Sequence, residues 1–409
     1  MVNSNKFVYS KTLKDFILCL SCFNFAEAEK EFKKITKKDY QKLVLKIIEL
    51  RLSGIFLKFV KNHDHINLKN ELFFKRLLER HSFIVKKNLL AYKDCIQISE
   101  RLEDKKIDYR FLKGIPLVLN YYKDINSREI RDIDILIEIK DLSVVLKELE
   151  KIGFYASQNP EVKIENLKID LSQYHHAPEL INSNGTRLEL HFRLGIHRPN
   201  IEEKIREQIL TNSDHSLIGN REILISDVNS TFLHLLYHSS IKEFFNPGPL
   251  YLTDIHFLKN KLDKELLLKK IKNIGLENHL KLIISIFNNY SEEKIFFKDE
   301  LLSDFSKEKK EEISCCENLM MNRKLGNEFR PLFLANSLSE LLKTSINLLA
   351  STKIKHKYLL VSQNDLKWNL KFTKLKEILV ILFKLLKLKL SSNIFREIKD
   401  LRKINKLIS

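Results

Sequence analysis

Two aspartates one residue apart, Asp132 and Asp134, stand in a segment at residues 131–137 that alternates polar and apolar side chains. Such alternation predicts a β-strand, in which residues two apart point from the same face. The two carboxylates would lie together while Ile133 and Ile135 enter the core. Close carboxylates repel each other unless a cation joins them, and Mg²⁺ takes such oxygen ligands together with substrate phosphates. A solvated strand edge is the alternative, because acidic pairs are frequent there.

A third carboxylate stands in a second alternating segment at residues 187–194, where Glu189, His191 and Arg193 share one face. Two aspartates on one strand and an acid on a neighbouring strand are what two-metal phosphoryl transfer requires, with one ion activating the nucleophile and the other bridging the phosphates. The sequence therefore predicts Asp132, Asp134 and Glu189 as metal ligands and catalytic residues. Mg²⁺ is the expected ion, and Mn²⁺ is the expected substitute.

Basic residues near the acidic strand are candidates for binding phosphate. Lys113 and Gly114 follow a short apolar run and precede a predicted helix. A glycine there lets the backbone approach a phosphate, and the N–H groups of a helix N-terminus attract the anion. The alternative is a plain turn, which a Lys-Gly pair at the end of a strand often forms.

Arg128 and Arg131 are the candidate arginines for phosphate binding, because a guanidinium can hold a phosphate through two hydrogen bonds. A surface ion pair with Glu129 or Asp124 is the alternative for either arginine. Both interpretations stay open at the level of sequence.

His176 and His191 are the candidate histidines of the site. An Asn-Gly pair at residues 184–185 predicts a tight turn between two extended segments. The expected register places Leu180 opposite Glu189 and His176 opposite Arg193, which sets His176 on the face of Glu189 and His191. The two imidazoles would orient phosphates or the acceptor, or transfer a proton near neutral pH. A purely structural role is the alternative.

His234 and His238 stand four residues apart on a predicted helix, a spacing that can form a metal pair. The glutamate that accompanies such a pair in the H-E-x-x-H motif does not follow this pattern. We therefore expect these two histidines to pack or to line the wall of a cleft.

The elements that position these residues follow from apolar periodicity. Residues 43–102 carry apolar residues three and four apart, which predicts an N-terminal helical lobe. Short β-like runs follow at residues 107–112, 133–139 and 188–194. Helices are predicted at residues 115–122, with Pro116 in the first turn, and at 142–152, ended by Gly153. Helical periodicity returns at residue 231, with breaks near 247–249, 322–331 and 362–365.

Composition supports a mostly helical chain with an anionic partner. The 409 residues are 44% hydrophobic and include only 9 glycines and 7 prolines, which fits long helices over a turn-rich sandwich or barrel. The length favours two domains, or one domain with a large extension. A net charge of +18 makes nucleic acid, nucleotides or an anionic membrane surface plausible partners. The alternative is a compositional bias toward Ile, Asn and Lys.

Targeting and redox signals are weak. The apolar stretch at residues 16–25 reads as a first helix rather than a signal peptide. No segment approaches about 18 uninterrupted apolar residues, so we predict no membrane span and a cytoplasmic protein. Of five cysteines, Cys19 and Cys22 form a C-x-x-C pair, but their apolar neighbours favour core packing in a reducing cytosol. The basic, apolar run at 375–390 and the segment after it would pack on the N-terminal lobe, lie on a membrane or bind RNA.

One family combines these motifs in this order. The motifs are Leu112-Lys113-Gly114, Tyr121-Tyr122-Lys123-Asp124, Arg128, Asp132-Ile133-Asp134, Gly153-Phe154, His175-His176 and Glu189-Leu190-His191-Phe192. Over roughly residues 10–260 the chain resembles the uncharacterised bacterial nucleotidyltransferase family of the polymerase-β-like superfamily. In the wider superfamily, Gly-Ser or Gly-Gly stands where this chain has Lys113-Gly114, and the gap to the first aspartate is usually shorter. The contact with the triphosphate would therefore differ here.

The resemblance implies an α+β, mostly helical fold with a polymerase-β-like nucleotidyltransferase core, a small mixed sheet with helices, embedded between helical regions. We expect an N-terminal helical lobe at residues 1–103, the catalytic core at 104–225 and a C-terminal helical domain at 226–409. Asp132 and Asp134 would be metal ligands. Glu189 would help to activate the acceptor.

The function that the resemblance implies is metal-dependent transfer of NMP from an NTP to an acceptor, with release of pyrophosphate. A sugar, a small metabolite, a peptide, a protein or an RNA end are all open as acceptors. One alternative is a toxin-like nucleotidyltransferase that modifies protein or tRNA, which the basic charge would suit. Another is a non-catalytic module that binds nucleic acid.

Overall fold

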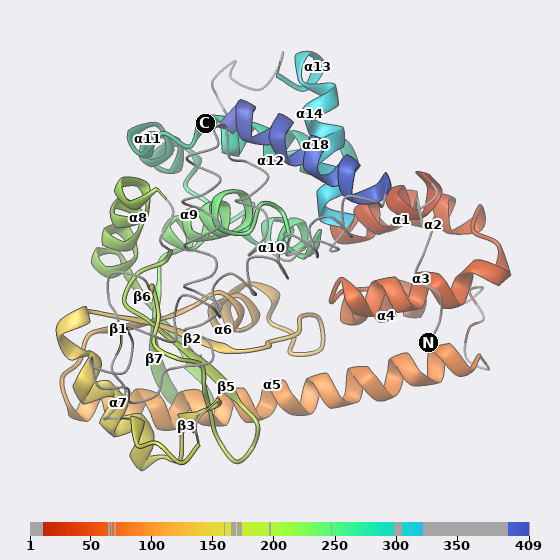
Figure 1. The fold of residues 1–409 in the computed structure, drawn as a ribbon. Helices are drawn as coiled ribbons and strands as arrows, with labels where there is room; N and C mark the ends of the chain where they lie inside the picture. The colour runs from red at the N-terminus through yellow and green to blue at the C-terminus, as the bar shows by residue number, and fades with distance from the viewer. Residues whose placement is uncertain are drawn as a thin grey trace, which may run out of the picture.

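A mixed β-sheet lies at the centre of the computed structural model, with helices on both sides (Figure 1). The structure describes residues 11–297, apart from gaps at 64–65, 67, 69–70, 159, 165–168, 170–173, 196–197 and 247, together with residues 305–321 and 392–408. Within these residues seven strands form one sheet in the order β3-β4-β5-β2-β1-β7-β6. The strands are β1 (Tyr109–Leu112), β2 (Ile133–Ile137), β3 (Tyr155–Ala156), β4 (Leu180–Ile181), β5 (Arg187–His191), β6 (Ser213–Ile218) and β7 (Arg221–Ser226).

The middle of the sheet confirms the three strands predicted from alternation. β2 pairs antiparallel with β1 and parallel with β5. In the β2–β5 ladder, Asp134 lies opposite Glu189 and Leu136 lies opposite His191. The strand register therefore brings two of the predicted carboxylates side by side.

The two faces of the sheet pack against different sets of helices. On one face Ile133 and Ile135 join a core with residues of α5 (Leu72–Asp104) and α7 (Leu142–Lys151). On the other face Leu136 joins a core built with helices from both ends of the described chain. Asp134 lies between Ile133 and Ile135 along the strand, so it points toward the second set of helices.

The N-terminal region is helical, as the sequence predicts. Its helices are α1 (Lys11–Ser21), α2 (Phe25–Lys33), α3 (Lys37–Glu49), α4 (Ser53–Lys61) and α5. The predicted first helix corresponds to α1, and all five cysteines are buried and free. This confirms core packing for Cys19 and Cys22.

The C-terminal region is also helical over the residues that the structure describes. It contains α8 (Pro199–Thr211), α9 (Val228–Tyr237), the π-helix η4 (His238–Lys242), α10 (Leu250–Leu258), α11 (Lys264–Ile274), α12 (Glu277–Tyr290), α13 (Phe305–Glu308), α14 (Lys310–Met321) and α18 (Ser392–Ile408). Helices α1 to α4 share one hydrophobic core with these elements, and α1 contacts both α10 and α12. The division into three domains stays a prediction.

The last helix, α18, packs mainly on α14 and also contacts α12, with Leu401 and Ile404 buried. Packing was expected for this end of the chain, but the main partner is a C-terminal helix rather than the N-terminal lobe. The run at residues 375–390 and the breaks at 322–331 and 362–365 lie outside the described residues. Among the helices that are described, none has the length and apolar character needed to cross a bilayer.

Three local features differ in detail from what the sequence predicts. The β6–β7 hairpin was not predicted, although Gly219 and Asn220 separate two alternating runs, and Gly219 adopts a φ of +61°. The predicted helix at 115–122 is confirmed, but it begins as a short α-helix, α6 (Gly114–Pro116), and continues as the π-helix η1 (Leu117–Tyr122). The register of the 184–185 hairpin was wrong by one residue, because Leu180 pairs with Leu188.

Gly54 fixes the position of α4 against the turn that leads into β2. A Cβ atom at this position would lie 2.0 Å from the carbonyl oxygen of Asn126 and 2.9 Å from the backbone of Ser127. Alanine is usually the better helix former by about 1 kcal/mol. The close approach of two backbones therefore explains a glycine in the first turn of this helix.

We predict that Gly54→Ala destabilises the protein despite its higher helix propensity. The Cβ atom must push the 126–127 backbone away from α4, and overpacking of this kind costs about 1–3 kcal/mol. Thermal unfolding of the variant should show a lowered Tm, whereas Lys61→Ala, at an exposed position of the same helix, should change it little. An unchanged or raised Tm for Gly54→Ala would contradict the close contact.

Candidate active site

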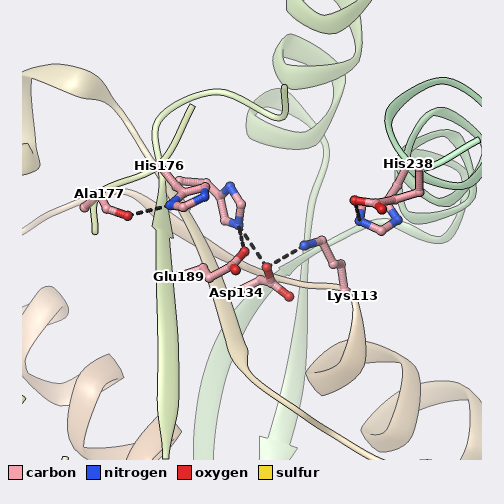
Figure 2. Close-up of polar contacts among 8 residues, drawn as sticks. Lys113, Asp134, His176, Ala177, Glu189 and His238 are labelled. Carbon is pink, nitrogen blue, oxygen red and sulfur yellow. Dashed lines mark hydrogen bonds and ion pairs between the residues drawn. The ribbon is translucent and has the colours of Figure 1, made fainter. Parts of the chain in front are cut away.

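Asp134 is the centre of a cluster of charged side chains on the face of the sheet that meets the C-terminal helices (Figure 2). Its Oδ1 accepts hydrogen bonds from Lys113 Nζ at 2.6 Å and from His191 Nε2 at 2.8 Å. The side chain is only 1% exposed, and its Oδ2 is buried without a hydrogen-bond partner among the described residues. Oδ1 therefore has two positively charged or polar partners, whereas Oδ2 has unused capacity to accept a hydrogen bond or bind a cation.

Glu189 extends the cluster from the neighbouring strand. Its Oε2 lies 3.2 Å from the same His191 Nε2 that contacts Asp134. Burial raises the pKa of both carboxyls, but Lys113 and His191 outweigh it and lower both. Both acids are therefore ionised at neutral pH, in a site where two negative charges would otherwise repel each other.

Lys113 supplies the positive charge that this pair needs. Burial lowers the pKa of its ammonium, but the carboxylates of Asp134, Glu189 and Asp132 outweigh burial and raise it. The backbone of Lys113 has a φ of +52°, a conformation that costs a non-glycine residue about 1–3 kcal/mol. The chain holds this strain where β1 ends, and the lysine side chain points at Asp134 (Figure 2).

Asp132 lies one residue before β2 and is not among the residues whose ligand atoms converge at Asp134. Burial raises the pKa of its carboxyl to about 6, and the negative charge of Asp134 adds to the rise. In the described part of the chain, the group able to offer three ligand atoms to one metal ion is Asp134, Glu189 and His191, with those atoms within 4.8 Å of one another. This group contains two of the three predicted ligands, with His191 in place of Asp132.

Arg128 has a different partner from the predicted phosphate. Its Nε and Nη2 donate to the two carboxylate oxygens of Asp254 at 2.7 and 3.1 Å, and Tyr122 Oη donates to the same Asp254 at 2.7 Å. All three side chains are buried. The alternative of a surface ion pair with Glu129 or Asp124 is therefore wrong for Arg128, which pairs with a buried acid from α10, and its contact with phosphate stays a prediction.

Arg131 and Gly114 lie at the margins of the cluster. Arg131 is exposed and close enough to Asp132 to lower the pKa of its carboxyl, although burial outweighs it. Gly114 opens α6, and a Cβ atom there would lie 3.1 Å from Arg128 Nη1. Gly114 thus allows Arg128 to pass close beneath the turn that carries Lys113.

His176 meets His191 across the sheet edge rather than pairing with Arg193. Their ring centroids are 5.4 Å apart, and His175 lies 5.8 Å from His191. Burial lowers the pKa of His176 to about 4, and His175 also shifts downward for this reason. Both rings are therefore neutral at pH 7, and the Nδ1–H of His176 donates to the carbonyl of Ala177 (Figure 2).

The helical wall opposite the sheet contributes His234, His238 and Lys242, spaced four residues apart. Burial lowers the pKa of both histidines, and the positive charge of Lys113 adds to the effect. His238 Nε2 lies 3.8 Å from Glu243 (Figure 2). The two imidazoles are therefore uncharged at neutral pH, and the burial of His234 agrees with the expected packing.

Lys242 is the residue that sequence reasoning missed. Its ammonium makes no hydrogen bond or ion pair with the described residues, and burial lowers its pKa to about 8, with Lys113 adding to the shift. The carboxylates of Glu243, Glu189 and Asp134 favour the charged form of Lys242 but do not outweigh burial and the charge of Lys113, so an added anion would stabilise this lysine. The sequence does carry one indication of Lys242. It stands four residues after His238, as His238 does after His234, so it continues the same helix face by one turn.

Comparison with known proteins gives one family. A family model described as an uncharacterised nucleotidyltransferase matches residues 36–290, which include every residue of the site. No curated protein matches the chain. The match spans the elements from α3 to α12 and extends well beyond the sheet.

We predict strong coupling between Arg128 and Asp254. Removing one partner leaves the other charge buried and unpaired, so Arg128→Met and Asp254→Asn should each lower the free energy of unfolding by about 3–5 kcal/mol. The double variant should lose much less than the sum of the two. Denaturant unfolding of the four proteins gives the double-mutant cycle. The control is Arg80→Met, which breaks the exposed pair with Glu129 and should lower the free energy of unfolding by less than about 1 kcal/mol. Additive losses would contradict the buried pair.

We predict that Lys242→Met stabilises the ligand-free protein at pH 7. Because the pKa of Lys242 is lower in the folded protein than in the unfolded chain, the penalty is fully present below about pH 8. It disappears as pH rises toward the ordinary lysine pKa. Thermal unfolding should show a Tm raised by about 2–4 °C at pH 7 and by less at pH 9.5. Exposed Lys261→Met is the control, and a lowered Tm for Lys242→Met would contradict an unpaired cation.

Proposed function

The chain belongs to this family of nucleotidyltransferases, and from that membership we propose that the Asp134 cluster transfers NMP from an NTP to an acceptor. The protein is thus a transferase of phosphorus-containing groups. In the proposed reaction an acceptor oxygen attacks the α-phosphorus, and the bond from that phosphorus to the pyrophosphate group breaks. The observation that carries this assignment is the buried, partly uncompensated Asp134 beside Glu189.

The acidic residues fit a divalent ion. Asp134 Oδ2 is buried without a partner, and Glu189 lies next to it on the adjacent strand. Asp134 and Glu189 would hold the ion, and Asp132 would complete the acidic triad. When bound, the ion neutralises phosphate charge and lowers the pKa of the attacking group. Both Mg²⁺, the ion expected from the sequence, and Mn²⁺ could serve in this reaction.

Lys113 and Lys242 would bind the triphosphate. Lys113 lies close enough to Lys242 for its charge to lower the pKa of the Lys242 ammonium. Lys242 makes no hydrogen bond or ion pair with the residues that the structure describes. Lys113 presently contacts Asp134. A cation bound at the carboxylates would free this lysine to contact phosphate oxygens. Holding the leaving pyrophosphate between two fixed cations stabilises charge that develops in the transition state.

Glu189 and the histidines would orient the acceptor. Glu189 is ionised and 25% exposed, so its carboxylate can accept a hydrogen bond from an incoming hydroxyl. His176 and His191 line the same side, and His176, which is neutral at pH 7, can orient the acceptor through a hydrogen bond. Arg128 would support the site through its ion pair with Asp254, because it lies directly against Gly114 in the turn that carries Lys113.

We propose that the sheet and its flanking elements at residues 104–225 are a polymerase-β-like catalytic core between two helical regions. The acceptor remains one of a sugar, a metabolite, a peptide, a protein or an RNA. The net charge of +18 supports a nucleic-acid or protein target of the toxin-like kind as the second candidate. A silent binding module is disfavoured, since it has no need of ionised, buried carboxylates with one open oxygen.

We predict that nucleotide binding requires divalent metal and the acidic cluster. Calorimetric titration of ATP, CTP, GTP and UTP with Mg²⁺ should show binding of at least one nucleotide to the wild type. Asp134→Asn and Asp132→Asn should each weaken this binding at least about tenfold, because they remove metal-binding charge.

Asp104→Asn, at an exposed position of α5, is the matched control and should bind as the wild type does. Circular dichroism of each variant establishes that it is folded. If a folded Asp134→Asn variant binds the same nucleotide equally well, or if no nucleotide binds to the wild type, the assigned site is wrong.

A further inference from the structure

The acidic cluster contains a nitrogen donor at its centre. His191 Nε2 lies 2.8 Å from Asp134 Oδ1 and 3.2 Å from Glu189 Oε2. These three side chains can each offer one ligand atom, and the atoms lie within 4.8 Å of one another. One imidazole nitrogen therefore faces two carboxylates from two paired strands.

Strand geometry explains why the three groups converge. Glu189 and His191 are two residues apart on β5, so they point from the same face. Asp134 lies opposite Glu189 in the parallel ladder. The side chain of His191 is 2% exposed, and the rings of His175 and His176 pack nearby. The imidazole is thus held in place by its surroundings.

A hydrogen bond alone does not account for this arrangement. One Nε2–H can be shared between two carboxylates, but Asp134 Oδ2 still lacks a partner at a position that water does not reach. A buried carboxylate oxygen without a donor is unfavourable. A cation among the three side chains would replace the proton on Nε2 and would join the carboxylates of Asp134 and Glu189, whose ligand atoms already converge with that nitrogen.

We propose that Asp134, Glu189 and His191 bind one divalent ion together, and that the nitrogen ligand makes the site favour a first-row transition-metal ion over Mg²⁺. This inference rests on the proposed function, because it concerns the ion of the same site. Mg²⁺ takes oxygen ligands and gives up its water reluctantly. Imidazole suits transition-metal ions, whose affinity for nitrogen ligands is greater. Asp132 then serves the site from outside this ligand set.

Mn²⁺ is the probe for this ligand set, because it is paramagnetic and its spin couples to a bound nitrogen. Pulsed electron paramagnetic resonance of the wild type with Mn²⁺ should show modulation from ¹⁴N, and protein labelled with ¹⁵N-histidine should show the corresponding ¹⁵N modulation. His191→Gln should lose the signal. His215→Gln, on the exposed strand β6, should keep it.

Competition between ions gives a second readout. Oxygen-only sites also bind Mn²⁺ more tightly than Mg²⁺. The decisive quantity is therefore how far the ratio of the two dissociation constants changes between the wild type and His191→Gln. The preference for Mn²⁺ should fall about tenfold or more in His191→Gln, mainly through weaker binding of Mn²⁺. The affinity for Mg²⁺ should change less.

Bound Mn²⁺ without histidine coupling in the wild type would overturn the inference, and it would do so even if the His191 variant failed to fold. A folded His191→Gln variant with an unchanged ion ratio would overturn it too. If Mg²⁺ and an NTP still bind through Asp134 in either case, the proposed function stands and only the nitrogen ligand is wrong. If no divalent ion binds to the wild type, both fail.

Discussion

Parallel pairing of β2 with β5 places Asp134 beside Glu189, and two carboxylates so close must be compensated by positive charge. Lys113 and His191 provide that compensation, because both contact Asp134 Oδ1. The other oxygen of Asp134 stays without a partner. The strained backbone of Lys113, the neutral ring of His176 and the half-buried ammonium of Lys242 all lie near these negative charges. A metal ion with a triphosphate would complete the balance of charge.

The helices hold this arrangement from both ends of the chain. Gly54 lets α4 rest on the turn before β2, and the Arg128–Asp254 pair joins the segment before β2 to α10. N-terminal and C-terminal helices share one hydrophobic core, so the wall that carries Lys242 is packed against the rest of the molecule. The family match at residues 36–290 includes α4, α10 and the sheet but leaves out α1, α2, α14 and α18, so the family model covers helices as well as strands.

Alternation and motif order were sufficient to predict the three central strands, because one side of each strand enters a core and leaves a strong pattern. The hairpin register at Leu180 was not predictable, since pairing depends on the turn and on local irregularities between His176 and His191. The partner of Arg128 lies on α10, more than a hundred residues away, and no local spacing points to Asp254. Lys242 was missed for a similar reason, because only the fold brings η4 over the sheet and shows that its charge lacks a partner.

The most direct test of the account is a crystal structure with Mn²⁺ and a non-hydrolysable NTP analogue, in which anomalous scattering locates the ion. The account predicts an ion in contact with Asp134 and Glu189, and Lys113 moved from Asp134 to the phosphate oxygens. The analogue bound elsewhere, with the Lys113–Asp134 ion pair intact and no ion at the carboxylates, would contradict it.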